Sequence, residues 1–205
     1  MGRTKKAEEK NAVFKAKTHQ TKKPGKDKEQ NGKVQFWKLK PAKDHPYARL
    51  SNFFLSPLTF DGNTHTSSEG AYQRAKFVYE GAPEINSEFV KELGKIPTAG
   101  ALKHAASLKE TGRFPWHKKI SDQFSRFRGL VKINPDWDNI RVDKMREIVQ
   151  ARFDQQPEFR RLLLSTGDRE IEETSPKDPF WGTGKDGKGQ NQLGKILMEI
   201  RDKNQ

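Results

Sequence analysis

The stretch that follows Pro135 most constrains the fold, because its apolar residues recur at helical spacing over several turns. Side chains three and four positions apart lie on one face of a helix, so the pattern predicts a long amphipathic helix that must bury one side. That apolar face is approximated by Ile140, Met145, Ile148, Val149, Arg152 and Phe153. Capping and breaking residues predict further helices at 66–79, 83–93, 97–108, 118–128, 158–164 and 191–202.

Short strands are predicted among these helices. Residues 34–39 are rich in aromatic and β-branched side chains. Asp61-Gly62 is a strong two-residue turn signal, which predicts a short hairpin over residues 57–66. Residues 169–172 alternate between polar and apolar and predict one more strand. We therefore expect a mainly α fold, a compact single domain with a few short β-strands.

The first 33 residues have a different character. They contain eleven Lys or Arg residues against four Asp or Glu residues, and almost no large apolar side chains. Such a segment buries too little apolar surface to fold, so residues 1–33 are predicted to be a disordered basic tail and residues 34–205 the folded domain. The net charge of the whole chain is +13. This charge is as typical of a polyanionic partner, such as nucleic acid, as of a solvated basic surface.

Composition excludes several classes of site. The chain has no cysteine, which excludes disulfides and thiolate metal sites and fits an intracellular protein, whether cytoplasmic or nuclear. The five histidines show no metal-ligand spacing. No apolar run approaches the ~20 residues of a membrane helix, and the first residues lack the apolar core of a secretory signal. We expect no metal, no cofactor and no membrane partner, and the sequence leaves the oligomeric state open.

The predicted helix that begins near Thr66 carries an unusual polar face. Glu69, Gln73 and Lys76 stand at i, i+4 and i+7, so a carboxylate, an amide and an amine share one side. Two interpretations are open for Glu69. Thr66 and Glu69 have the spacing of a capping box, in which both side chains satisfy the first backbone amides of the helix. Alternatively, the polar face is the wall of a catalytic site, although Lys76 also fits a lysine that extends from a helix edge into solvent.

Residues 174–190 contain four glycines and two prolines and are predicted to form a loop. A P-loop is disfavoured, because Gly189 stands where Ser or Thr would bind magnesium. A glycine-rich loop before a helix can still present backbone amides to a phosphate; a flexible surface loop is the other interpretation. Asp178 fits either a turn residue before Pro179 or part of a site.

A basic and aromatic segment follows residue 112. Its aromatic residues alternate with Lys and Arg, a pattern that fits a stacking surface for nucleic acid and equally a helical core. The residues concerned are Phe114, Trp116, Phe124, Phe127 and Trp137, with Arg113, Lys118, Lys119, Arg126 and Arg128.

Three segments together resemble the NADAR (NAD- and ADP-ribose-associated), or YbiA-like, family. The first is Leu50-Ser51-Asn52-Phe53 with Ser56-Pro57 and Asp61-Gly62; the second is Ser68-Glu69-x-x-Tyr72-Gln73-x-x-Lys76-Phe77. The third includes Ser175-Pro176-x-Asp178-x-x-Trp181-Gly182-x-Gly184 and Gly189-Gln190-Asn191-x-Leu193-Gly194. They span residues 34–203 in the family's order. Many members have His after the glutamate, where this chain has Gly70, and residues 103–130 match the family poorly.

The resemblance implies a mainly α-helical YbiA-like fold and a metal-independent N-glycosidase. Two activities are associated with the family. One removes ADP-ribose from ADP-ribosylated guanine bases, and the other hydrolyses N-glycosidic bonds of early riboflavin-pathway intermediates. The positive charge favours the first activity, with nucleic acid as partner. The alternatives are the riboflavin-type reaction and a non-catalytic module that binds ADP-ribose or nucleic acid.

On this interpretation the catalytic residues are Glu69, Lys76 and Asp178. Glu69 would transfer a proton or stabilise a cationic ribose. Lys76, if burial lowers its pKa, would form a Schiff base with the opened ribose, and Asp178 would position the ribose. The expected substrate-binding residues are Arg49, Asn52, Gln73, Trp137, Trp181, Gly182, Gly184 and Asn191, with Asn191 and the backbone amides of 182–190 at the phosphates.

Overall fold

The computed structural model describes residues 32–37, 45–110, 112 and 114–205. Nearly all of the predicted basic tail lies outside these residues, as do the last two positions of the predicted 34–39 strand and Arg113. Lys33, the last residue of the predicted tail, is ion-paired with Glu170 at 2.8 Å and Glu172 at 2.7 Å.

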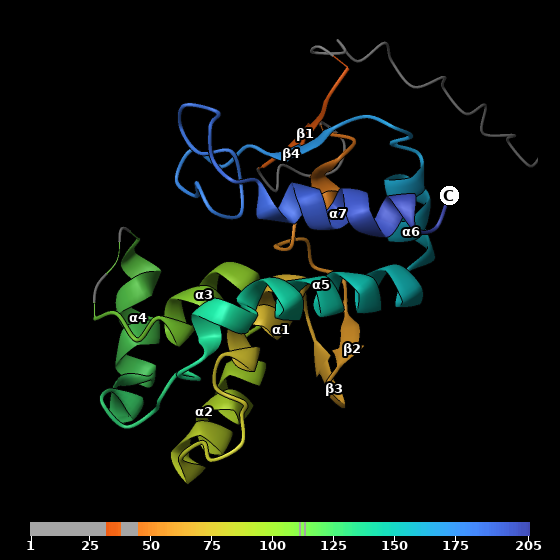
Figure 1. Ribbon diagram of the computed structural model, residues 1–205. Coiled ribbons are helices and arrows are strands. Elements are labelled where there is room, and N and C mark those ends of the chain that lie inside the picture. Colours follow the sequence, from red (N-terminus) through yellow and green to blue (C-terminus); the bar gives the residue numbers. More distant parts are fainter. Residues whose placement is uncertain (1–31, 38–44, 111, 113) are drawn as a thin grey trace, which may run out of the picture. The chain divides into compact units, whose positions relative to one another are not determined.

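Helices dominate the described residues, as predicted (Figure 1). They are α1 (Ser68–Ala75), α2 (Glu84–Gly94), α3 (Ala99–Ala106), α4 (Pro115–Gln123), α5 (Trp137–Gln155), α6 (Pro157–Leu164) and α7 (Gln192–Asp202), with 3-10 helices η1 (Ala48–Leu50) and η2 (Ser125–Phe127). The strands are β1 (Val34–Phe36), β2 (Leu58–Phe60), β3 (Asn63–His65) and β4 (Ile171–Glu173). Within this part of the chain, no helix combines the length and the apolar character needed to cross a membrane.

Two strand pairs interrupt the helices. The predicted hairpin is present, with β2 antiparallel to β3 and Leu58 opposite His65. Its turn residues Asp61 and Gly62 both have positive φ, which suits a tight two-residue connection. The other pair joins β1 to β4 in parallel, with Val34 opposite Ile171. The first described strand of the chain is therefore held by a strand far along the sequence.

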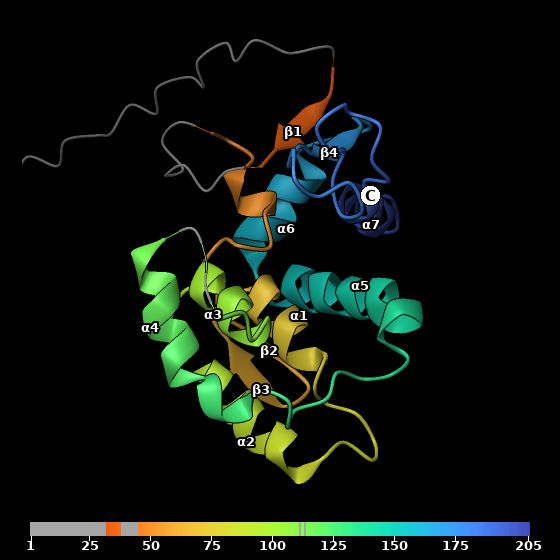
Figure 2. The same cartoon turned by 90° about the vertical axis from the view of Figure 1, so that its left-hand side faces the viewer.

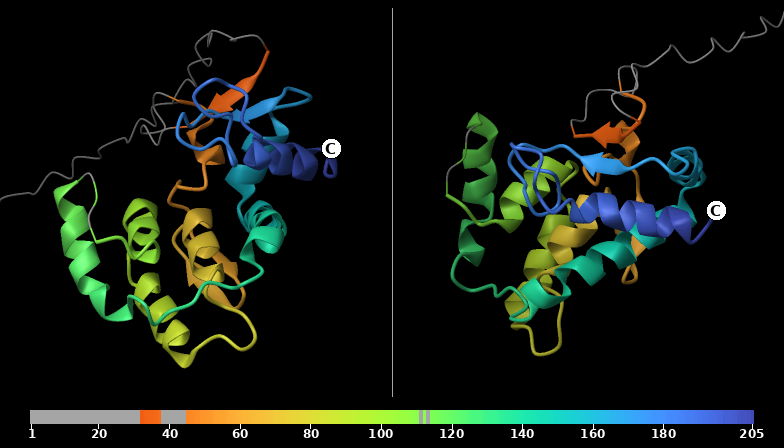
Figure 3. Two further views of the ribbon diagram at one scale, coloured as in Figure 1. Left: turned by 60° about the vertical axis from the view of Figure 1, so that its left-hand side comes forward. Right: turned by 45° about the horizontal axis from the view of Figure 1, so that its top comes forward.

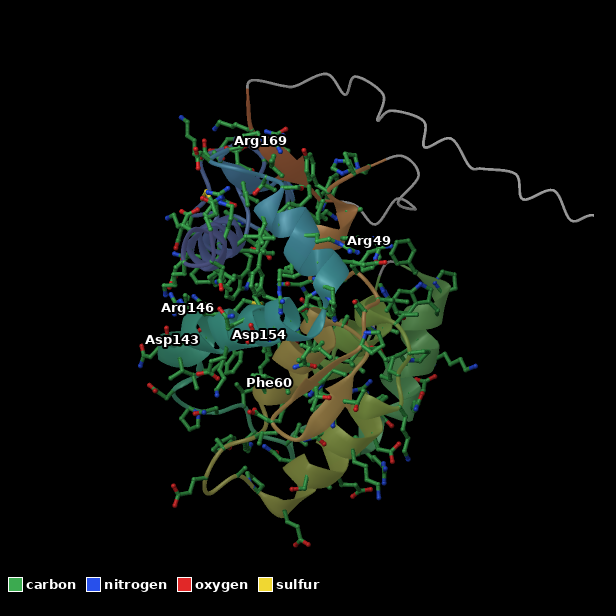
Figure 4. All side chains as sticks on the ribbon, turned by 90° about the vertical axis from the view of Figure 1, so that its right-hand side faces the viewer. Arg49, Phe60, Asp143, Arg146, Asp154 and Arg169 are labelled. Carbon is green, nitrogen blue, oxygen red and sulfur yellow. The ribbon has the colours of Figure 1, made fainter. Side chains whose placement is uncertain are left out.

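The long helix α5 anchors the larger of two cores. Its predicted apolar face is buried at Met145, Ile148, Val149 and Phe153, and packs against α1, α6 and α7. The guanidinium of Arg152 is buried in the same face and donates to the backbone oxygens of Arg49 and Ser51. Arg146, also on α5, forms ion pairs with Asp143 and with Glu199 of α7. Figure 4 shows Arg146 and Asp143 together on α5.

A second core lies under α2, α3 and α4. It contains Phe77, Phe89, Leu93, Phe124 and Phe127, with ring contacts of 4.7 to 5.9 Å among the phenylalanines. Phe124 and Phe127 are therefore core residues. For these two side chains, the helical-core interpretation of the basic aromatic segment holds and the stacking-surface interpretation does not.

Helix α1 lies between the two cores. It packs against α3 and α5, and all eight of its residues are buried (Figures 1 and 3). A solvent-facing helix would expose one side, so the polar side chains of α1 must be accommodated within the fold. Three of them, Glu69, Tyr72 and Gln73, border a cavity.

Candidate functional site

The cavity has a volume of about 600 Å³ and is bordered by α1, α3, α5, the segment after η1, and the end of β4 with the loop that follows. Its lining is mixed in a way that suits a ligand with both ring and charged groups. The aromatic members are Trp37, Phe53, Tyr72, Trp137 and Trp181; the charged members are Glu69, Glu173, Asp178, Lys76, Lys103 and Arg141; the others are Ser51, Asn52, Gln73, Met145, Ser175 and Leu193.

The polar face of α1 forms one wall of this cavity. Gln73 Nε2 donates to Glu69 Oε1 at 2.8 Å, and Lys76 Nζ donates to Gln73 Oε1 at 2.7 Å. The three side chains that the sequence placed on one face are thus linked in a row. Glu69 is 5% exposed and also lies 3.5 Å from the Lys103 ammonium group. A carboxylate and two amines therefore line the same cavity.

The capping-box prediction for Glu69 was wrong. The N-cap of α1 is Ser67, whose Oγ accepts from Gly70 N at 3.1 Å, and the Thr66 hydroxyl has no hydrogen-bond partner among the described residues. The helix begins one residue later than expected, which puts Glu69 at the second helical position instead of the third. Its side chain is consequently free of a capping role and points along the wall to Gln73.

Lys76 ends α1 with its amine inside the cavity. Burial lowers the pKa of this amine below the usual value, with smaller lowering from Lys103 and Arg141, while the charge of Glu69 raises it. The net direction is downward, so the neutral amine is more populated than in an exposed lysine. A neutral amine is the nucleophilic form, and Lys76 therefore meets the condition set for Schiff-base chemistry.

Glu173, at the end of β4, is a cavity residue that the sequence reasoning missed. Burial, and secondarily the negative charge of Asp178, raise the pKa of this carboxyl to about 7. Glu173 Oε1 accepts from Ser175 N at 3.1 Å. Strand alternation could have found this residue, because Glu173 shares a strand face with buried Ile171, whereas Glu172 between them binds Lys33 and Gln35.

Asp178 lines the cavity and also shapes its own loop. Its Oδ1 accepts from the backbone amides of Phe180 and Trp181, at 3.2 and 2.9 Å. Both interpretations of this residue thus apply: it is a turn residue, and it presents a carboxylate close to Glu173.

An aromatic platform closes another side. The Tyr72 ring lies between Trp137 and Trp181, with centroid distances of 5.1 and 5.4 Å. Arg141 lies 3.8 Å over the ring of Phe180, and its Nε is buried without a hydrogen-bond partner among the described residues. A buried unpaired N–H next to a cavity is suited to an anionic ligand group.

Three predicted phosphate-binding residues do not line the cavity. The amides of Gly182 and Asn191 are bonded to the oxygens of Asp178 and Gly182, and the Asn191 side chain ties Glu173 N to Ile171 O. Gly184 has φ of +70°, a conformation that suits glycine. These residues belong to the loop that carries Asp178 and Trp181, and the amides of Gly182 and Asn191 are hydrogen-bonded within it.

Of the two predicted substrate-binding residues near position 50, Asn52 lines the cavity and Arg49 does not. Asn52 lines the cavity, where its Nδ2 lies 3.2 Å from Met145 Sδ and its backbone oxygen accepts from Glu69 N. Arg49 does not line it; its guanidinium pairs with Glu158 of α6 at 2.6 Å (Figure 4). Of the other predicted residues, Gln73, Trp137 and Trp181 all reach the cavity.

Within the described residues, no group of three or more His, Asp or Glu side chains is arranged to hold a metal ion.

Comparisons with known proteins point to one family. A family model described as the NADAR domain matches residues 35–204. N-glycosidase YbiA of Shigella flexneri serotype 5b (strain 8401) is 30% identical over 156 residues, which are 76% of this chain and 81% of that protein. Riboflavin biosynthesis protein VVA0006 of Vibrio vulnificus (strain YJ016) is 33% identical over 159 residues, 78% of this chain and 36% of that protein.

The solved NMR structure of the E. coli protein YbiA covers 83% of this chain and 83% of its own, with a TM-score of 0.58 and 26% identity. The predicted fold class, mainly α-helical and YbiA-like, is thus confirmed.

Proposed function

Because the chain belongs to the NADAR family, we propose that it is an N-glycosidase that removes ADP-ribose from ADP-ribosylated guanine bases in nucleic acid. The observation that carries the proposal is the convergence of Glu69, Lys76 and Glu173 on one cavity beside an aromatic platform. The reaction needs charge stabilisation, proton transfer and a place for the base, and this cavity offers a group for each.

Cleavage of an N-glycosidic bond builds positive charge on the anomeric carbon and leaves a base nitrogen that needs a proton. Glu69 accepts from Gln73 and lies near Lys103, partners that suit a carboxylate, and its charge would stabilise the cationic ribose. Glu173, with its pKa raised to about 7, is more readily protonated at neutral pH than an ordinary glutamate and is our candidate for the group that protonates the departing base.

Lys76 offers a covalent route. The ribose ring opens as its oxygen leaves the anomeric carbon and takes a proton. The Lys76 amine bonds to that carbon, and the guanine nitrogen leaves with a proton, which gives an imine. Water then hydrolyses the imine, releasing ADP-ribose and the free lysine. The lowered pKa of Lys76 supports this route over a permanently charged amine.

The remaining lining residues fit the rest of such a substrate. Arg141 and Lys103 carry positive charge for a pyrophosphate, and Arg141 Nε is a buried donor without a partner among the described residues. Trp137, Trp181 and Tyr72 supply ring surfaces for a base. Asn52 and Gln73 add amides that can bind ribose hydroxyls.

A second candidate is hydrolysis of the N-glycosidic bond in a riboflavin-pathway intermediate. It is favoured by the similarity to the Vibrio vulnificus protein named for riboflavin biosynthesis. The bond that breaks is of the same type, so the same residues would serve. The net charge of +13 favours the nucleic-acid substrate, since a small phosphorylated ribose compound needs no basic surface.

The test is to incubate the full chain with an oligodeoxynucleotide that carries ADP-ribosylated guanine, and in parallel with a ribosylated pyrimidine intermediate of the riboflavin pathway. Products are separated by chromatography and identified by mass. Release of ADP-ribose, absent with Glu69→Gln, supports the proposal. Turnover of the pyrimidine alone supports the second candidate. Tight binding of ADP-ribose without release from either substrate would identify a non-catalytic binding module.

A further inference from the structure

Two aromatic rings at the start of α4, one on its N-cap residue Phe114 and one on Trp116, lie outside both cores. Phe114 and Trp116 are 50% and 41% exposed, and their rings stack at a centroid distance of 5.9 Å with an 8° angle between planes. Phe124 and Phe127 of the same basic segment are fully buried. The stacked pair therefore belongs to neither core.

Two histidine rings, His117 and His104, hold the pair in place. The Trp116 ring contacts His117 at 4.0 Å and His104 of α3 at 5.9 Å, and His104 stacks on His117 at 4.1 Å. Gly112 leaves room for the His117 ring, since a Cβ there would lie 1.7 Å from His117 Nδ1. An exposed ring fixed by such contacts loses little conformational freedom when it binds a flat partner.

The sequence segment that contains this pair is basic. Residues 103–130 contain seven Lys or Arg and two acidic residues, whereas the rest of 34–205 has 22 basic and 21 acidic residues. Lys118 is paired with Asp122 and Arg128 with Glu110. Among the described residues, Lys109 and Lys119 are exposed and have no carboxylate within ion-pair distance.

This surface adjoins the cavity through α3. Lys103 lines the cavity beside Glu69, and the next residue, His104, contacts Trp116. Helix α3 packs against α1 on one side and α4 on the other, in agreement with the views of Figures 1 and 2. The cavity and the exposed pair thus lie on opposite sides of the same helix, α3.

We propose that the α4 face, formed by Phe114, Trp116, Lys109, Lys118 and Lys119, binds the single-stranded nucleic acid that flanks the modified guanine. The inference rests on the proposed function, which requires a guanine to leave its base stack and enter the cavity. Exposed rings stack on unpaired bases of any sequence, and lysines neutralise the phosphates between them. A solvated helix face would account for the lysines but not for a braced aromatic pair.

The test measures binding of the full chain to a fluorescein-labelled, unmodified 12-nucleotide single strand by anisotropy. Trp116→Ala should weaken binding by about 5- to 100-fold, the range for loss of one stacking ring, whereas Trp116→Phe should stay close to wild type. Lys119→Glu should weaken binding and reduce the slope of log K against log salt by about 0.7. Lys195→Glu, at an exposed lysine of α7, is the matched charge control and should do neither.

A second measurement separates this surface from the chemistry. Trp116→Ala and Lys119→Glu should lower kcat/KM on an ADP-ribosylated oligonucleotide and leave turnover of ADP-ribosylated guanosine unchanged. If wild type turns over neither substrate, yet single-strand binding depends on Trp116, the surface is supported and the proposed activity fails. If Trp116→Ala unfolds, Lys109→Glu and Lys119→Glu test the surface instead, because each should reduce the slope of log K against log salt.

Three results would overturn the inference. The first is equal binding by wild type, Trp116→Ala and Lys119→Glu. The second is a preference for the duplex over DNA and RNA single strands of the same sequence. The third is an equal effect of Lys195→Glu and Lys119→Glu. That result would mean that binding depends on the net charge of the protein and not on the α4 face.

Discussion

A Cβ atom at Gly182 would lie 2.1 Å from Glu173 Oε2 and 2.5 Å from the backbone oxygen of Glu173. Gly182 therefore keeps the space that the Glu173 carboxyl occupies beside the cavity. Gly182, which the sequence assigned to phosphate binding, lies outside the cavity lining and leaves room for a carboxyl group that is part of it.

Gly182→Ala should move Glu173 and strain β4. We expect a loss of about 1 to 3 kcal/mol in the free energy of unfolding, the usual cost of overpacking, together with a lower kcat/KM. Urea denaturation and turnover measure the two effects. Gly100→Ala is the control, because a Cβ there meets nothing within 4 Å and its backbone is helical; it should not destabilise the protein. Equal behaviour of the two variants would contradict the role of Gly182.

The raised pKa of Glu173 predicts the pH dependence of the reaction. A carboxyl with a pKa of about 7 is mostly protonated below pH 7 and mostly ionised above it. If its proton goes to the leaving base and Lys76 is not the nucleophile, kcat/KM should be high below pH 7 and fall about tenfold per unit well above it. On the Lys76 route the rate should also fall at low pH, because protonation removes the nucleophilic amine. Glu173→Gln should lower the rate by about 10²- to 10⁴-fold and remove this limb of the profile. A limb that persists in the Gln variant belongs to another group.

Lys76 should be trapped by reduction if the imine route operates. Sodium borohydride added during turnover should attach reduced ADP-ribose to the peptide that contains Lys76, as detected by mass spectrometry. Lys76→Arg keeps a positive charge but no nucleophilic amine, so it should give no adduct and no turnover. Normal turnover by Lys76→Ala would exclude the covalent route.

Glu69 and Ser67 separate catalysis from capping on one helix. Glu69→Gln should lower turnover by about 10²-fold or more while thermal unfolding changes little, because the N-cap is Ser67. Ser67→Ala should cost about 1 kcal/mol of stability, the usual value for a lost cap. Thr66→Ala should cost no cap energy, since its hydroxyl has no partner among the described residues. A larger stability loss from Glu69→Gln than from Ser67→Ala would reinstate the capping role.

Periodicity predicted the elements of the fold well, because it depends on local geometry. The row Glu69, Gln73 and Lys76 follows from helical spacing, and the structure shows it as a row of hydrogen bonds. The start of α1 was missed by one residue, since Thr66 and Ser67 are equally good caps in sequence. This shift of one residue determines whether the Glu69 side chain can cap the backbone amides of the helix.

The composition of the cavity was harder to predict, because it depends on which distant segments meet. Lys103 and Arg141 lie on helices whose exposed faces are not distinguishable from cavity faces in the sequence. Arg49 is close to Asn52 in the chain but pairs with Glu158. Glu173 was the one omission that a local rule, the alternation of strand β4, could have prevented.

The parallel pairing of β1 with β4 has a consequence for how the protein reaches its active form. Residues 34 and 171 must meet before Trp37, which follows β1, and Glu173, which ends β4, can border the same cavity. Contacts between residues so far apart in sequence form slowly, because closing the long loop between them costs conformational entropy before the contacts can stabilise the structure. We therefore expect the cavity to be completed late in folding, after contacts that are closer in sequence have formed.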